Sequence, residues 1–321
     1  MAESTLSVTF EDLARSTAFH LGYQRKADSG EGLSSVRVAN VEAANKAGYR
    51  NFLAAWDWGF LTPRAEFTLW TTATGTAAAG LTTTVTATTA VFFPSMIGHS
   101  IVFESGNSYT ITAYTSATVV TVSSTAVADS STDFTITADG VYRLPDDFGS
   151  MESERIFFAP NNQDTRTIAF IGEPLVREAW QITTQFQRPS IAAVLPLSAA
   201  AGTGQRFDLL VAAIPDDDYE VTFRYNVHPN ALTTGLYPYG GMKHAETIRL
   251  SCLASAEQMF FEGKNEQQRY YAQALERSIA LDKRQSRAER LGVSYEREHY
   301  RMRPYGRYTE VVGGTVEGVQ Y

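Results

Sequence analysis

The sequence predicts an α+β fold in which a helical bundle built from both chain ends is combined with an antiparallel β region and a small inserted β domain. Residues 242–291 are the one long segment with sustained helical periodicity, and two further helical faces are predicted near the other chain end, at residues 9–21 and 35–56. The middle of the chain instead alternates apolar and hydroxyl residues. Since each predicted helix has a single apolar stripe, we expect the helices of the two chain ends to pack together in one core.

Composition limits the class of protein. The chain has 321 residues, 44% of them hydrophobic, so it can bury a core in one large or two moderate domains. No apolar run is long enough to cross a membrane, and residues 1–10 lack the parts of a signal peptide. We therefore expect a protein that is not exported by a signal peptide. The net charge of -8 argues against binding driven by phosphate neutralisation.

Two helices are predicted before residue 60. Thr9 and Asp12 form a capping-box pattern, which starts a helix over residues 9–21, and Gly22 ends it. A longer helix follows over residues 35–56, in which Gly48 lies on the apolar face and lets a neighbouring helix approach. The aromatic residues Trp56, Trp58 and Phe60 crowd together after this helix. We interpret them as the base of a core rather than as a ligand-stacking platform.

The second helical pair is predicted over residues 242–262 and 265–291. Gly263 separates the two helices, Asn265 has the position of an N-cap, and Gly292 follows the second helix as a C-cap. So short a link predicts a helical hairpin. The single cysteine, Cys252, lies on the apolar stripe that runs from Ala245 to Phe260, so we expect a small buried hydrophobe rather than a reactive thiol.

The middle of the chain predicts strands. Residues 65–142 contain no Lys or Arg, and we expect strands at residues 100–103, 109–114 and 119–123, with a turn at Gly106. Residues 75–139 are predicted to form the inserted β domain. Residues 141–148 are predicted to be a strand that runs into a proline turn, and further strands are expected at residues 206–211 and 219–227. A short helix is expected from Glu173, with Leu175, Ala179 and Thr183 facing inward.

Motifs for chemistry are largely missing from the sequence. The five histidines are scattered without metal-ligand spacing, and no phosphate-binding loop or nucleophile elbow is present. The run Asp216-Asp217-Asp218 lacks the further ligands of a calcium loop, and it is predicted to be a turn, as is Asp146-Asp147. We therefore predict no catalytic residue, no metal and no cofactor. A carboxylate pair contributed by distant parts of the chain stays open as an alternative.

The tail of the chain, residues 292–321, has a composition unlike the rest. Its arginines alternate with tyrosines, and both residue types are enriched at interface hot spots. We predict a docking segment, with a frayed terminus and a single-stranded nucleic-acid site as the alternatives. Its candidate contact residues are Tyr295, Arg297, Tyr300, Arg301, Arg303, Tyr305, Arg307 and Tyr308.

Several short motifs occur in an order that resembles the order found in one protein family. Leu21-Gly22-Tyr23 ends the first helix, Trp56-Asp57-Trp58 follows the second, and a strand with a proline turn spans residues 142–148. Gly172-Glu173-Pro174, residues 215–219 and His244 at the start of the helical hairpin come next. This order is similar to that of the head-to-tail adaptors of tailed bacteriophages, also called connectors or tail accessory factors. The resemblance covers nearly the whole chain except residues 75–139.

The resemblance implies a structural virion protein without an active site. Such adaptors form rings, with twelve subunits implied here, which bind the portal protein, receive tail or nozzle proteins and surround the passing double-stranded DNA without reading its sequence. The implied location is the neck of the virion, after assembly in the host cytoplasm. Residues 1–74 with 140–291 are then the adaptor core, and the tail is the portal-docking segment. The alternatives are a receptor- or glycan-binding tail protein and a cell-wall-degrading tail enzyme.

Overall fold

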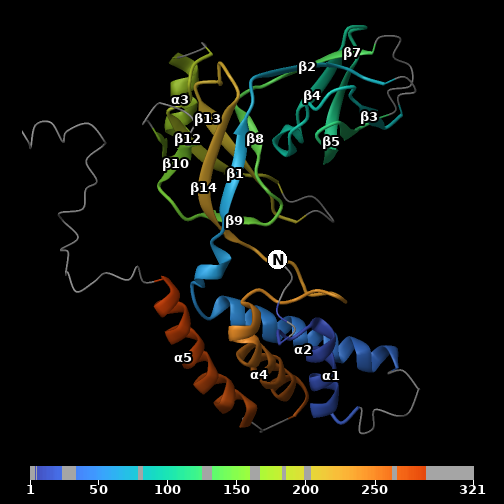
Figure 1. The fold of residues 1–321 in the computed structure, drawn as a ribbon, viewed down its shortest axis with the longest axis vertical. Coiled ribbons are helices and arrows are strands. Elements are labelled where there is room, and N and C mark those ends of the chain that lie inside the picture. The colour runs from blue at the N-terminus through green and yellow to red at the C-terminus, as the bar shows by residue number, and fades with distance from the viewer. Residues whose placement is uncertain are drawn as a thin grey trace, which may run out of the picture. The chain divides into compact units, whose positions relative to one another are not determined.

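The computed structural model describes residues 4, 6–23, 34–78, 82–124, 132–159, 167–182, 186–198, 204–261 and 266–286. The chain divides into two compact units. The first, the helical unit, takes its described residues from Met1–Pro63 and Val227–Val293. The second, the β unit, is formed by the described residues of Arg64–Asn226. Figure 1 labels the elements of both units.

The predicted fold class, an α+β fold organised by a helical bundle from both chain ends, is wrong. Across its described residues the chain is mostly β, with fourteen strands in two curled sheets and five α-helices. The error has a physical cause. A helix repeats its apolar period many times, whereas strands of three to six residues, such as β2 or β8, repeat theirs only once or twice. The helices therefore dominated the sequence pattern, although the strands outnumber them among the described elements.

The helical unit contains four α-helices and one short 3-10 helix. These are α1 (Phe10–His20), α2 (Ser35–Ala54), η1 (Gly59–Leu61), α4 (Gly241–Phe260) and α5 (Glu266–Ser286). Helix α4 contacts α1, α2 and α5. The capping box that was predicted at Thr9 and Asp12 is confirmed, since each side chain accepts a hydrogen bond from the backbone of the other residue. Asn265, Gly263 and Gly292, the other predicted helix signals, lie outside the described residues.

A close approach of α2 and α4 forms the centre of this unit. A Cβ atom built on Gly48 would lie 2.6 Å from the backbone nitrogen of Cys252 and 2.7 Å from the carbonyl oxygen of Ser251. The Ser251 hydroxyl uses this approach to donate a 2.7 Å hydrogen bond to the Gly48 carbonyl. The predicted role of Gly48 is thereby confirmed. Cys252 is buried as predicted, and burial raises the pKa of its thiol to about 12.

The larger sheet of the β unit has eight strands. These are β1 (Arg64–Leu69), β8 (Val141–Arg143), β9 (Phe148–Met151), β10 (Arg155–Phe158), β11 (Thr167–Phe170), β12 (Ile191–Pro196), β13 (Phe207–Ala212) and β14 (Tyr219–Val227). Their order is β1-β14-β10-β11-β12-β13-β8, and β9 also pairs with β14. Along the order from β1 to β8, only the pair of β11 and β12 is parallel. The strand predicted over residues 219–227 is confirmed as β14.

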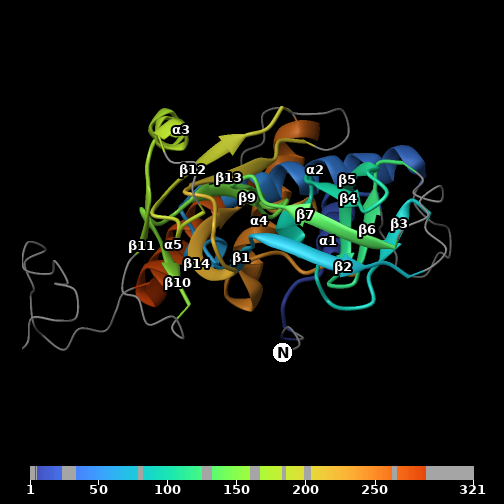
Figure 2. The ribbon, with the colours of Figure 1, turned by 90° about the horizontal axis from the view of Figure 1, so that it is seen from above.

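Helix α3 (Glu173–Ile182) covers part of this sheet and contacts β12 and β13 (Figures 1 and 2). Its buried side chain is Val176, which packs with Ala193 and Leu210, and Trp180 donates a 2.7 Å hydrogen bond to the carbonyl of Val211. Of the residues predicted to face inward, Ala179 packs against this cluster as predicted, whereas Leu175 is 56% exposed and that part of the prediction is wrong. Thr183 lies outside the described residues.

The second sheet of the β unit is almost closed into a barrel. Its strands are β2 (Thr72–Thr76), β3 (Thr84–Thr86), β4 (Ser100–Phe103), β5 (Ser108–Ser116), β6 (Val119–Val122) and β7 (Asp133–Thr137). They follow the order β2-β7-β4-β5-β6-β3, and the two ends of the sheet meet at a bridge between Ala77 and Ala87. We call residues 72–137 the small barrel. The predicted strand at residues 100–103 is confirmed as β4, and Gly106 turns the chain with a φ of 89°.

The interior of the small barrel is apolar, and its outer positions carry hydroxyl groups. The buried side chains come from alternate positions of the strands, from η2 (Pro94–Met96) and from the segment just before it, and they include Val85, Phe92, Met96, Ile101, Phe103, Ile111, Val120, Val122, Phe134 and Ile136. Phe92 stacks on Phe134 with ring centroids 5.6 Å apart. Three threonines of β2 point the other way and are exposed, namely Thr72, Thr74 and Thr76. A barrel of this size is filled by its side chains.

Candidate functional site

The predicted docking residues cannot be placed. Tyr295, Arg297, Tyr300, Arg301, Arg303, Tyr305, Arg307 and Tyr308 all lie outside the described residues. The portal-docking tail therefore stays a prediction, and the two described units hold two other candidate sites.

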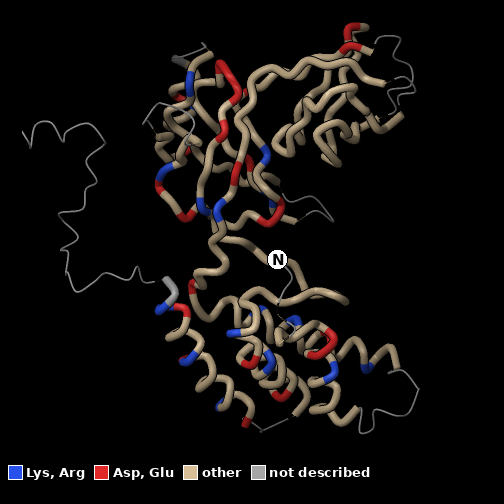
Figure 3. The backbone as a smooth tube through the Cα atoms, in the orientation of Figure 1, with Lys and Arg blue, Asp and Glu red and all other residues tan. Residues whose placement is uncertain are grey.

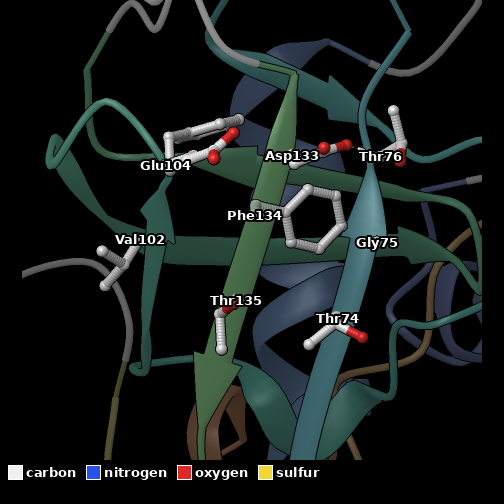
Figure 4. A pocket seen from close by; sticks show the side chains of 9 residues that line it. Thr74, Gly75, Thr76, Val102, Glu104, Asp133, Phe134 and Thr135 are labelled. Atoms are coloured by element: carbon white, nitrogen blue, oxygen red, sulfur yellow. Dashed lines mark hydrogen bonds between the residues drawn. The ribbon is translucent and has the colours of Figure 1, made fainter.

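One candidate is a groove on the small barrel, with a volume of about 540 Å³. Strands β2, β4 and β7 contribute its walls, and Figure 4 shows their side chains around the ring of Phe134. We call it the barrel groove. It is lined by Thr74, Gly75, Thr76, Val102, Phe103, Glu104, Asp133, Phe134 and Thr135.

The register of the strands explains this groove. Gly75 lies directly opposite Phe134, and a Cβ atom on Gly75 would come within 2.8 Å of the phenyl ring. The glycine therefore makes room for an aromatic ring on the neighbouring strand. One residue pair further along, the hydroxyl of Thr76 donates a 2.7 Å hydrogen bond to a carboxylate oxygen of Asp133. None of these residues was predicted from the sequence to belong to a site.

The chemistry of the barrel groove favours binding over hydrolysis. Glu104 and Asp133 place two carboxylates on its wall, which is the kind of pair that a glycan-cleaving enzyme uses. Both side chains are exposed, however, whereas the general acid of such an enzyme is usually shielded from water. The threonine hydroxyls and the carboxylates instead offer hydrogen-bond partners to a polar ligand or to a basic side chain.

The second candidate is a cluster in the helical unit where the aromatic residues that follow α2 meet α4 and α5. We call it the aromatic joint, and it comprises Phe52, Trp56, Trp58, Phe60, His244 and Asp282. The predicted aromatic cluster after residue 55 is thus confirmed as part of a core, since Trp58 is only 1% exposed. Trp58 also donates a 3.0 Å hydrogen bond to the carbonyl of Phe52.

Asp282 ties α5 to this joint. Its buried carboxylate accepts hydrogen bonds from the backbone nitrogen of Gly59, at 3.2 and 3.3 Å, and from the indole nitrogen of Trp56, at 3.3 Å. The ammonium group of Lys283 lies 4.6 Å from the centre of the Trp56 ring, within the range of a cation–π contact. The carboxylate is therefore engaged in holding η1 against α5, and this arrangement is structural.

His244 occupies the interior of the joint. Its imidazole ring centre lies 5.1 Å from that of Trp58 and 5.3 Å from that of Phe60, and the residue is 1% exposed. Burial lowers the pKa of His244 below its ordinary value, and the charge of Asp282 opposes this effect only in part. A neutral, buried histidine among aromatic rings fills the core, and no nucleophile adjoins it in these contacts.

The aspartates that were predicted to lie in turns have structural roles. Asp216 accepts a 2.8 Å hydrogen bond from the hydroxyl of Tyr219, and Asp218 accepts one of 3.0 Å from the backbone of Thr71, as expected of a turn before β14. Asp147 accepts a 3.1 Å bond from the hydroxyl of Tyr225. Among the described residues, no group of three or more His, Cys, Asp or Glu side chains could hold a metal ion. No helix in the described part of the chain is long and apolar enough to cross a membrane.

Comparison with known proteins returned no match, either among protein-family models or among curated proteins. The resemblance to phage adaptors therefore rests on the sequence motifs.

Proposed function

We propose that this chain is a structural protein of a tailed bacteriophage, a head-to-tail adaptor that forms a ring between the capsid portal and the tail. In this role it binds the portal protein and tail or nozzle proteins, and it surrounds the passing double-stranded DNA. It acts without a catalytic residue, a metal or a cofactor. Its location is the neck of the virion, following assembly in the host cytoplasm.

The observation that carries the proposal is the meeting of the resemblance motifs in the aromatic joint. Trp56, Trp58 and His244 come from two of the motifs, far apart in sequence, and their side chains belong to one cluster. The Asp282 carboxylate in this cluster accepts hydrogen bonds from Gly59 and Trp56, and these bonds join α5 to η1 and to the residues that follow α2. A cluster whose carboxylate is engaged in joining elements suits a subunit whose task is to transmit contacts between head and tail.

Charge supports the same role. The chain has a net charge of -8, and the small barrel contains no Lys or Arg (Figure 3). A ring with an excess of acidic side chains does not hold phosphates tightly, and DNA has to pass through such a ring without arrest.

Co-sedimentation of the purified protein with the portal protein of the same phage tests this proposal. We expect a complex that sediments ahead of the portal alone and contains the adaptor in a fixed ratio to the portal. An adaptor that stays at the top of the gradient, with the portal unchanged, would contradict the proposed function.

The barrel groove favours a second candidate function, glycan binding by the small barrel. Its threonine hydroxyls and the carboxylates of Glu104 and Asp133 are suited to sugar hydroxyl groups. A glycan array probed with the intact protein and with Asp133→Ala tests this function. Binding that the substitution abolishes would support a receptor-recognition role, and an array without binding would exclude the glycans that it carries.

A further inference from the structure

Helix α5 has one face packed and one face open. Its packed face contributes Tyr271, Ser278 and Asp282, which are all buried, and the helix contacts α4 and η1. The Ser278 hydroxyl lies 2.6 Å from that of Thr247 on α4. The side chains on an adjoining face occur at helical spacings of three, four and seven residues and are exposed. We call this face the α5 stripe, and it consists of Tyr270, Gln273, Arg277, Leu281 and Arg284.

The α5 stripe combines large apolar groups with cations. Tyr270 is 48% exposed and Leu281 is 38% exposed, although both carry large apolar side chains. Arg277 and Arg284 flank Leu281 on the helix, and neither has an ion-pair partner among the described residues. Lys283 differs from them, because it lies over the ring of Trp56. Figure 3 shows Lys and Arg along α5.

We propose that the α5 stripe is the rigid first part of the portal-docking surface, and that it takes an acidic protein surface with an apolar patch. This inference rests on the proposed adaptor function. Exposed tyrosine, leucine and arginine on one helical face have the composition of an interface core, in which arginine forms paired hydrogen bonds with carboxylates. The partner groups are therefore Asp or Glu side chains placed around an apolar contact for Leu281.

The chemistry of the stripe favours a protein over nucleic acid. Glu266 and Glu276 lie on α5 beside the stripe, and Glu266 accepts a 3.5 Å hydrogen bond from the Tyr270 hydroxyl. Carboxylates at these places repel phosphates, whereas a protein surface can present either sign of charge opposite them. Leu281, in addition, has no favourable contact with a phosphate backbone.

The sequence that follows α5 supports the same partner. The pattern of Tyr and Arg on the stripe continues beyond Ser286 with Arg287, Arg290, Tyr295 and Arg297. A docking surface that begins on a packed helix has part of its geometry fixed before binding, which reduces the entropy cost of association. The docking surface that was predicted to begin at residue 292 therefore begins on α5.

A charge-reversal experiment tests this inference in the full-length chain. The double variant Arg277→Glu and Arg284→Glu should weaken binding to purified portal by at least about tenfold in biolayer interferometry, because two central cations become anions. Leu281→Ala, which leaves the charge unchanged, should weaken binding by about fivefold. The matched control is Lys46→Glu with Arg50→Glu, which makes the same change at exposed positions of α2 and should leave the affinity within about twofold.

The possible outcomes separate this inference from the proposed function. Wild-type protein that binds the portal, together with unchanged binding by the α5 variants, would overturn the α5 docking surface and leave the adaptor function standing. Equal losses in the α5 variant and the α2 control would also overturn it, because general electrostatic attraction would then explain binding. If the α5 variants lost binding to duplex DNA but still bound the portal, the stripe would be assigned to nucleic acid instead. Wild-type protein that fails to bind the portal would refute both proposals.

Discussion

The helical unit and the small barrel use the same small residues in opposite ways. In the helical unit these residues lie inside, where the Thr17 hydroxyl donates a 2.7 Å hydrogen bond to Asn45 and Gly48 admits the backbone of α4. In the small barrel the threonines of β2 lie outside, and rings such as Phe134 fill the interior. Small residues thus bring helix backbones together in one region and leave the solvent face of strands polar in the other. The helical unit should therefore be sensitive to added volume, and the barrel to lost volume.

Removing volume from the barrel should have the largest effect. Phe134→Ala should lower the free energy of unfolding by about 3–5 kcal/mol, because the ring contacts Phe92 and Phe103 and covers Gly75. Urea unfolding of the full chain measures the change. Thr137→Ala on the exposed face of the same strand is the control and should stay within about 0.5 kcal/mol. A tolerated Phe134→Ala would mean that the barrel interior is not packed as described.

Adding volume to the helical unit should have the next largest effect. Gly48→Val should destabilise the unit by about 3 kcal/mol, because the new side chain meets backbone atoms of Ser251 and Cys252 that cannot rotate away. Thermal unfolding followed by circular dichroism at the helix band measures it. Ala43→Val, at an exposed position of the same helix, adds a β-branched side chain without a collision and should cost less than about 1 kcal/mol. Similar losses in both variants would show that helix propensity, rather than close approach, matters at Gly48.

Acid should have a smaller effect, through His244. Burial lowers the pKa of the folded imidazole below the ordinary value of 6.5, so the unfolded chain binds a proton first as the pH falls. Stability that is present above pH 6.5 should therefore decrease below it, until the folded pKa is reached. Urea midpoints at pH 7.5, 6.5 and 5.5 measure this, and His244→Phe should reduce the decrease. His228→Gln, at an exposed histidine, is the control. A His244→Phe variant with the wild-type pH profile would remove His244 as the cause.

Local patterns were predictable from the sequence, and long-range pairings were not. The capping box at Thr9, the turn at Gly106 and the alternation in β14 each depend on neighbouring residues, and the structure confirms them. The strand partners were missed because they are distant in sequence. Strand β14 pairs with both β1 and β10, and neither is its neighbour along the chain. The mostly β character followed from many such short pairings, which no single stretch of residues reveals.

The candidate sites show the same division. The crowding of Trp56, Trp58 and Phe60 was visible in the sequence, but the part played by Asp282 was not, because its partner Gly59 comes from the other end of the chain. Glu257 was missed for a related reason. Its buried carboxylate on α4 accepts a 2.7 Å hydrogen bond from the backbone of Gln267 in the first turn of α5, a capping contact from a preceding helix. The barrel groove required the register that sets Gly75 opposite Phe134.

Electron microscopy of the purified protein mixed with its portal tests the central claim most directly, namely that this chain is a ring-forming adaptor. Class averages should show a second ring stacked on the portal ring, coaxial with it, and the number of subunits can be read from end-on views. Bare portal rings beside monomers of the chain, at protein concentrations well above those used for sedimentation, would contradict the adaptor function.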